Sequence, residues 1–302
     1  MSEQEENLEQ GSHQSAFGEL RQNESQQSKT QTDKFVDIHC HCLPNIDDGP
    51  ATMEEAISLC RLLARDRIST VVATPHQLGR FDTNNNGKKI KEKVGELNSQ
   101  LQHNQIPLTV LPGADVRIDE RIVGLVKSGE VLTVADGGKY LLLEMPENIL
   151  ISIEPLAEEL SSVGIKIIIS HPERQRFLAM QPRILLKWSE KKCGIQITAG
   201  SLLGRFGSIS QKAAWQILSM PVPLIVATDS HSTTGRSPCM RAAFEMICRQ
   251  LGGQTARIVC IENPTRAVEG KELLNIQGRK MRLGEYAGIQ NIFGRPAVAE
   301  QN

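Results

Sequence analysis

The sequence lacks both a strong net charge and a long hydrophobic run. Its 302 residues carry a formal net charge of -1, so it has no general attraction to nucleic acid or to anionic lipid. No apolar run approaches the ~20 residues that a membrane-spanning helix needs. The first ten residues are acidic and polar, without the basic and apolar regions of a secretory signal. These absences predict a cytoplasmic protein that neither binds nucleic acid nor inserts into a membrane.

The cysteines lack the spacing of a disulfide framework. There are seven, an odd number, and no two are arranged as CxxC. Most fall within apolar periodic segments, where a thiol behaves as a small hydrophobic group. This usage is typical of a protein in a reducing compartment.

Composition divides the chain into three parts. Residues 1–33 are rich in Gln, Glu, Ser and Asn, and their few bulky apolar side chains predict a disordered polar tail. Residues 34–269 alternate strand-like apolar runs with helical patterns, which favours an α/β fold with a parallel sheet. Seven such units predict a closed or nearly closed barrel. Residues 270–302 are expected to form a C-terminal extension.

Six of the seven expected strands end at histidines or carboxylates. The expected strands are residues 36–41, 68–75, 108–113, 140–143, 165–170, 194–198 and 224–228. In an α/β barrel, the strand ends at one face hold the active site. So many nitrogen and oxygen ligands predict a site for several metal ions. The residues at or just after these ends are His39, His41, His76, Asp115, Glu144, His171, Asp229 and His231.

The first strand carries the pattern Asp37-x-His39-x-His41. Side chains two residues apart share one face of a strand, so these three are expected to point together. Two imidazoles on one face can hold one divalent ion. Asp48, in the following loop, is interpreted as a further oxygen ligand, although Asp47-Asp48-Gly49 also fits an ordinary Asx turn.

Carboxylates follow two apolar strands directly. Asp115 and Glu144 would be costly to bury unless they were paired or bound to metal. The alternative interpretation of each is a salt bridge or a helix N-cap. Two arginines lie close in sequence to expected ligands, Arg174 after His171 and Arg236 after His231. A guanidinium group binds an oxyanion through two parallel hydrogen bonds, so the pair predicts an anionic substrate such as a phosphate ester.

The ordered motifs resemble those of the PHP (polymerase and histidinol phosphatase) superfamily. Within it, they are most similar to the bacterial manganese-dependent tyrosine-protein phosphatases of capsule and exopolysaccharide loci. The motifs are DIHCHCLPNIDDGP, ATPH, LPGADVRI, YLLLEMP, IISHPERQR, QITAGSLLGRFG and ATDSHSTTGR. The resemblance implies a distorted (β/α)7 barrel, a TIM-like PHP fold with its active site at the carboxyl ends of the strands.

The resemblance also implies a trinuclear centre that binds Mn2+, with iron, cobalt, zinc or magnesium as alternatives. The first metal would be held by His39, His41, Asp115 and Asp229. The second would be held by Asp115, Glu144 and His171, and the third by Asp48, His76 and His231. Arg174 and Arg236 would bind the phosphate, and metal-bound hydroxide would attack phosphorus in line. The bridging carboxylate is usually Glu in this family, whereas here it is Asp115, which is one methylene shorter.

The implied function is the hydrolysis of phosphotyrosine on proteins. The implied partner is a tyrosine-phosphorylated protein, above all a bacterial tyrosine autokinase of capsule or exopolysaccharide synthesis. The alternatives are another PHP phosphoesterase acting on a histidinol-phosphate-like molecule, an amidohydrolase-type barrel hydrolase, and a barrel without metals that serves as a scaffold. A cysteine phosphatase is also suggested by the C-x5-R spacing of Cys260 and Arg266. That spacing is interpreted as coincidence, because the segment lacks the glycines that would cradle a phosphate.

Overall fold

A computed structural model of the protein describes residues 34–82 and 85–276. The expected polar tail, residues 1–33, lies outside these ranges, as does the expected C-terminal extension beyond residue 276. No helix within the described ranges is long and apolar enough to cross a membrane.

All the strand pairs between named strands are parallel, and the second and third expected strands are each followed, after a break, by a short strand that the sequence patterns did not predict. β2 (Ile68–Ala73) continues into β3 (His76–Gln77), and β4 (Thr109–Pro112) continues into β5 (Asp115–Arg117), so that each pair forms one broken strand. β2 pairs with β4, and β3 pairs with β5. Each broken strand therefore keeps one position in the sheet. The unbroken strands are β1 (Phe35–Cys40), β6 (Tyr140–Glu144), β7 (Lys166–Ile169), β8 (Gly194–Thr198) and β9 (Leu224–Ala227).

The sheet closes between its first and last strands. The Asp229 N–H donates to the His39 carbonyl at 2.8 Å, and the His41 N–H donates to the Ser230 carbonyl at 2.8 Å. With the two broken strands counted once each, the order around the ring is that of the sequence. The prediction of a distorted seven-stranded α/β barrel is therefore confirmed.

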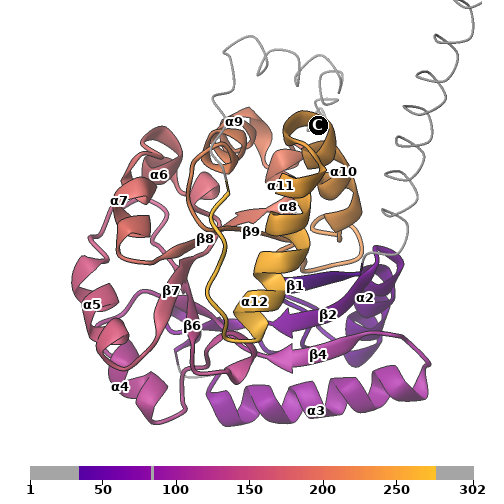
Figure 1. Ribbon diagram of the computed structural model, residues 1–302. Coiled ribbons are helices and arrows are strands. Elements are labelled where there is room, and N and C mark those ends of the chain that lie inside the picture. Colours follow the sequence, from indigo (N-terminus) through magenta and orange to yellow (C-terminus); the bar gives the residue numbers. More distant parts are fainter. Residues whose placement is uncertain (1–33, 83–84, 277–302) are drawn as a thin grey trace, which may run out of the picture. The chain divides into compact units, whose positions relative to one another are not determined.

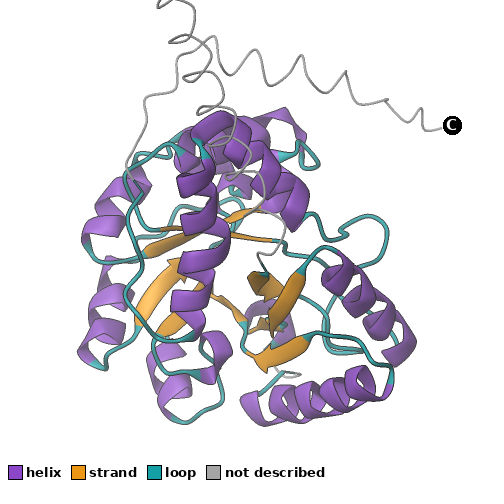
Figure 2. Ribbon diagram, turned by 45° about the vertical axis from the view of Figure 1, so that its right-hand side comes forward, coloured by secondary structure: helices purple, strands orange, loops and turns teal. Residues whose placement is uncertain are grey.

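Helices surround the strands, as Figures 1 and 2 show. The sequence patterns did not reveal α6, α8, α11 and α12, which have only four to six residues each; hydrophobic periodicity is hard to recognise in so short a segment. The α-helices are α2 (Met53–Arg65), α3 (Gly87–His103), α4 (Ile122–Lys127), α5 (Glu154–Ser162), α6 (Arg176–Met180), α7 (Ile184–Glu190), α8 (Ala199–Leu202), α9 (Gly207–Leu218), α10 (Met240–Leu251), α11 (Gly253–Arg257) and α12 (Asn263–Val268). A π-helix, Ile258–Glu262, joins α11 to α12.

The barrel interior is apolar at one end and polar at the other. Leu142 of β6 and Ala227 of β9 belong to a buried inner cluster that also includes Ala267 of α12. Two residues after Leu142 lies Glu144, the last residue of β6, and two residues after Ala227 lies Asp229, which follows β9 with a left-handed backbone (φ 51°). The apolar layer of the barrel therefore gives way to a polar layer at the carboxyl ends of the strands.

Candidate active site

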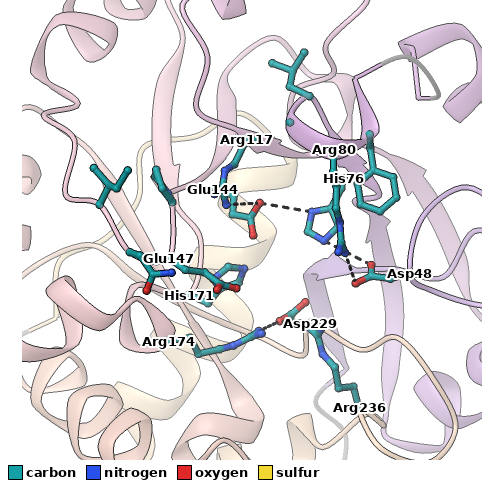
Figure 3. Close-up of a pocket in the computed structure, with 16 residues that line it drawn as sticks. Asp48, His76, Arg80, Arg117, Glu144, Glu147, His171, Arg174, Asp229 and Arg236 are labelled. Carbon is teal, nitrogen blue, oxygen red and sulfur yellow. Dashed lines mark hydrogen bonds and ion pairs between the residues drawn. The ribbon is translucent and has the colours of Figure 1, made fainter.

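The structure brings all nine predicted ligands together at the carboxyl ends of the strands. Most of them are fully buried, while Asp48 has 39% of its side chain exposed. Figure 3 shows His76 between Glu144 and Asp48, on the same cavity as His171 and Asp229. The cavity has a volume of about 590 Å³. The polar strand ends therefore form one site.

His39 lies at the buried centre of this site. Its Nε2 atom is 3.2 Å from Nε2 of His41, 3.3 Å from Oδ1 of Asp229 and 3.7 Å from Oδ2 of Asp115. Asp115 Oδ2 is in turn 3.7 Å from Nε2 of His171. Ligand atoms on four different strand positions thus face one small volume.

A second group gathers around Asp48. Its Oδ1 atom is 3.3 Å from Nε2 of His231 and 3.6 Å from Nε2 of His76. The other ring nitrogen of His76 faces the opposite way, 3.5 Å from Asp115 Oδ2 and 3.8 Å from Glu144 Oε2. His76 therefore links the exposed end of the site to the buried end.

The ligand atoms form four overlapping groups, within each of which all atoms lie within 4.8 Å of one another. Every one of the nine predicted ligands belongs to at least one group. The groups are His41, Asp48, His76 and His231; His39, His171 and Asp229; His39, His41 and Asp115; and His76, Asp115 and Glu144.

Several buried polar atoms in the site lack a hydrogen-bond partner among the described residues. They include both carboxylate oxygens of Asp115 and Oδ1 of Asp229. A buried carboxylate without a partner is strongly unfavourable, and structures rarely contain one. Divalent cations would satisfy these oxygens together with the histidine nitrogens that face them. The donor set, imidazole nitrogen and carboxylate oxygen, suits zinc, iron and manganese. The residues present thus fit the implied metals.

The electrostatics of the site favour the ligand forms of His41 and Asp115, whereas, despite burial, the hydrogen bond and charge of Asp115 raise the pKa of His76 to about 9. Burial and the neighbouring His231 and His76 hold the pKa of His41 well below its ordinary value, so its imidazole is neutral. Burial by itself would raise the pKa of Asp115, but His39, His171 and His76 hold it well below its ordinary range. Metal binding requires a neutral histidine and an ionised carboxylate, and both are available here.

Two residues that the sequence analysis left without a role orient the central histidines. Gln196 of β8 accepts a hydrogen bond from Nδ1 of His39 at 2.9 Å, and Asp47 accepts one from Nδ1 of His41 at 2.6 Å. Each bond turns the Nε2 atom toward the centre, which is the usual role of a second layer around a metal. Gln196 stands out in retrospect as the polar residue of the otherwise apolar run Gly-Ile-Gln-Ile. Asp47 also makes the expected Asx turn, accepting the Gly49 N–H at 2.9 Å.

Asp37 does not join its neighbours in the site. The pairing of β1 is irregular between Asp37 and Cys40, so the simple alternation expected along this strand breaks down. The Asp37 carboxylate instead accepts hydrogen bonds from the backbone N–H and the hydroxyl of Thr228. Burial raises the pKa of Asp37 to about 7. Because of the irregular pairing, the expectation that Asp37 shares a face with His39 and His41 is wrong.

Both predicted phosphate-binding arginines line the cavity. Arg174 and Arg236 each donate to Oδ2 of Asp229, and Arg236 also donates to Nε2 of His231 at 2.9 Å. Their side chains are 25% and 28% exposed, so they reach both the buried ligands and the opening. Arg80 and Arg117 also line the cavity, although the sequence analysis did not single them out.

The arrangement around Cys260 does not suit a cysteine phosphatase. Cys260 is fully buried in the π-helix and does not line the described cavity. Burial raises the pKa of its thiol well above the ordinary value, whereas a nucleophilic cysteine needs a lowered one. The C-x5-R spacing is therefore a coincidence. All seven cysteines are free.

A model of the family described as "Capsular polysaccharide synthesis, CpsB/CapC" matches residues 35–269. The chain belongs to the CpsB/CapC family. It is 33% identical over 211 residues to the putative tyrosine-protein phosphatase CapC of Staphylococcus aureus, covering 70% of this chain and 82% of that one. It is 32% identical over 241 residues to the tyrosine-protein phosphatase YwqE of Bacillus subtilis, covering 80% of this chain and 91% of YwqE.

Solved structures agree with the sequence relatives. A crystal structure from a study of YwqE from Bacillus subtilis and CpsB from Streptococcus pneumoniae, described as metal-dependent tyrosine phosphatases, superposes with a TM-score of 0.77. The sequences are 29% identical, and the match covers 82% of this chain and 99% of that one. The resemblance to capsule-type tyrosine phosphatases seen in the motifs is thus confirmed, and the CpsB/CapC relatives do not favour an amidohydrolase activity.

Proposed function

We propose that this protein is a metal-dependent phosphomonoesterase that hydrolyses phosphotyrosine on proteins. The observation that carries the proposal is the cluster of nine ligands, most of them buried, beside two cavity-facing arginines, in a chain of the CpsB/CapC family. A phosphate ester needs cationic groups around its oxygens, and this cavity offers both metal ligands and guanidinium groups.

Up to three divalent ions, with Mn2+ as the proposed metal, would be held by the ligand sets that the family resemblance implies. The buried set is His39, His41, Asp115 and Asp229; the second is Asp115, Glu144 and His171; and the third is Asp48, His76 and His231. The short distances from Asp48 to His231 and His76 support the third set, and those from His39 to Asp229 and Asp115 support the first. In the second set, Glu144 and Asp115 face His76 as well. Bound ions would supply Lewis-acid chemistry, because they polarise phosphoryl oxygens and lower the pKa of water.

The chain's own residues would bind and orient the substrate. Arg174 and Arg236 would hold the phosphoryl oxygens, each still anchored by Asp229. Gln196 and Asp47 would keep the histidine rings in their binding orientation. The leaving group of phosphotyrosine is a phenolate, whose conjugate acid has a pKa of about 10. Such a group needs less protonation than an alkoxide, which suits a site without a separate general acid.

The same proposal covers the catalytic domain and the partner protein. Residues 34–269 would form the catalytic domain, and the substrate would be a tyrosine-phosphorylated protein, with a bacterial tyrosine autokinase as the proposed partner. The family description, capsular polysaccharide synthesis, supports that choice of partner. The cytoplasmic location expected from the sequence stays a prediction.

Phosphatase assays and metal analysis on a single preparation of the protein test the proposal. We expect the manganese-loaded protein to release phosphate from a phosphotyrosine peptide much faster than from a phosphoserine peptide or histidinol phosphate. A chelator should abolish turnover and added Mn2+ should restore it, while a thiol-alkylating agent should have no effect. Sensitivity to alkylation without sensitivity to chelation would contradict the metal site. A metal content near zero that added manganese does not raise would favour a scaffold instead.

A further inference from the structure

Phe206 faces both arginines that the proposed function places on the phosphate. The ring belongs to the turn between α8 and α9, within the motif QITAGSLLGRFG, and is half-buried. The guanidinium carbon of Arg174 lies over the ring, 4.4 Å from its centroid, and that of Arg236 lies 6.0 Å from the same centroid. Two cations from different segments, one after β7 and one after β9, thus lie against one aromatic ring.

An aromatic ring at this position can fix the orientation of a guanidinium plane, which the carboxylate of Asp229 by itself does not. Asp229 Oδ2 accepts from both arginines, and Arg236 also contacts Nε2 of His231. For Arg174, however, the single carboxylate oxygen leaves the guanidinium plane free to rotate about that contact. An aromatic ring attracts the flat face of the guanidinium group and leaves the in-plane N–H groups available. Bidentate binding of a phosphate needs those N–H groups in a fixed plane.

The surroundings of Phe206 hold the ring in position. Gly200 of α8 leaves space for it, because a Cβ atom there would lie 2.9 Å from Cε2 of Phe206. The neighbouring Arg205 donates to the carbonyl of Ser237 at 2.8 Å. Ser237 directly follows Arg236, so the turn that carries Phe206 is tied to the loop that carries one of the two arginines.

We propose that Phe206 is a positioning residue for phosphate, which acts by orienting Arg174 and Arg236. The inference rests on the proposed function and deepens it. It predicts that loss of the ring weakens the binding of any phosphate monoester and of free phosphate alike. Metal content and the chemical step should change little, because the ring packs against the two arginines, which are not predicted metal ligands.

The test uses the full-length, metal-loaded chain with the substitutions Phe206→Leu and Phe206→Tyr. We expect Phe206→Leu to raise KM for a phosphotyrosine peptide and the Kd for inorganic phosphate roughly tenfold, in line with the loss of two cation–π contacts. The value of kcat should stay within about twofold, since the lost interaction is common to ground state and transition state. Phe206→Tyr keeps the ring and should restore both constants. Gly200→Ala, which crowds the ring, should shift them in the same direction as Phe206→Leu.

Phe177→Leu is the matched control, because Phe177 is 39% exposed on the nearby helix α6 and does not line the described cavity. It should leave phosphate affinity unchanged. Calorimetric titration with inorganic phosphate needs no turnover, so it tests Phe206 even if the wild-type protein fails to hydrolyse phosphotyrosine. A folded, metal-loaded Phe206→Leu protein that binds phosphate as tightly as the wild type would overturn the proposal. So would a fall in kcat and metal content with phosphate affinity intact, because that would mean a purely structural role.

Discussion

Asp229 is the residue at which the metal ligands and the arginines meet. Its Oδ1 atom lies 3.3 Å from Nε2 of His39 and 3.6 Å from Nε2 of His41, while its Oδ2 atom accepts from Arg174 and Arg236. One carboxylate therefore turns one oxygen toward the histidine ligands and the other toward the two arginines. Burial would raise its pKa, but His39 and Arg236, with further cationic neighbours, hold the pKa well below its ordinary range.

Asp115 shows how a shorter side chain can serve a central position. It is the first residue of β5, with His76 as its partner on β3 and Leu142 as its partner on β6. Its Oδ2 atom lies 3.5 to 3.7 Å from nitrogens of His39 on β1, His76 on β3 and His171 just after β7. Because β5 begins at Asp115 and pairs there with His76, the backbone of Asp115 already lies close to the histidines, and a short side chain is enough to face them.

Gln196 should matter for metal affinity although it is not a predicted ligand. Its Oε1 atom accepts from Nδ1 of His39 at 2.9 Å and from the backbone N–H of His171 at 3.2 Å. We expect Gln196→Leu to weaken the binding of Mn2+ by about 10- to 100-fold, because the ring of His39 loses its orienting bond. Equilibrium titration of the metal-free protein measures this. Gln100→Leu, on the exposed face of α3, is the control and should bind manganese normally. Equal affinities in the two variants would remove Gln196 from the site.

At the scale of the element, the breaks in two strands place ligands at the site. Pro75 lies between β2 and β3 and has no N–H to donate to a neighbouring strand. Gly113 lies between β4 and β5, where the backbone passes so close to β2 that a Cβ atom would be 2.6 Å from Cγ1 of Val72. The short strands after these breaks begin with His76 and Asp115. The break in each strand is therefore the feature that presents its ligand.

Gly113→Ala should disturb both folding and metal binding. The added methyl group has no space beside the buried Val72, and overpacking of this kind costs about 1–3 kcal/mol of the free energy of unfolding. We also expect weaker manganese binding, because Asp115 is only two residues away. Denaturant unfolding and metal titration give the two values.

The control for this variant is Gly124→Ala. Gly124 lies within α4, and no atom lies within 4 Å of the position that its Cβ would take. Replacing a helical glycine with alanine should stabilise the fold by about 0.4–1 kcal/mol. If Gly113→Ala were as stable as Gly124→Ala, the close approach of β4 to β2 would not constrain the barrel.

At the scale of the whole molecule, the barrel has two separate sources of stability. The inner apolar cluster and the outer cluster between strands and helices are built from buried hydrophobic side chains. The polar end contains carboxylates that need cations. Metal removal should therefore loosen the polar end while the hydrophobic clusters keep the barrel folded.

We expect the metal-free protein to keep its far-ultraviolet circular dichroism but to unfold at a lower temperature. At a free Mn2+ concentration 100 times its Kd, one site contributes about 2.7 kcal/mol to the free energy of unfolding. Thermal unfolding with chelator, and then with excess manganese, measures the difference. Identical melting temperatures in the two conditions would show that the described ligands do not bind the metal in the folded state.

The sequence by itself determined which side chains form the site. His39, Glu144, His171 and Asp229 each lie at or just after the end of an apolar strand, and parallel strands of a barrel present their carboxyl ends at one face. That local pattern is enough to predict that they meet. It also predicted the seven-stranded barrel, because strand and helix patterns alternate along the chain.

Only the tertiary structure decided how these side chains are held. Gln196, Phe206 and Gly113 owe their places to contacts with residues far away in the sequence or on other elements, namely His39, Arg174 and Val72. No periodic pattern records such contacts, since they depend on the register and the spacing of elements after the barrel has closed. Asp37 is the complementary case, in which an irregularity in strand pairing overrode the alternation that its spacing predicted.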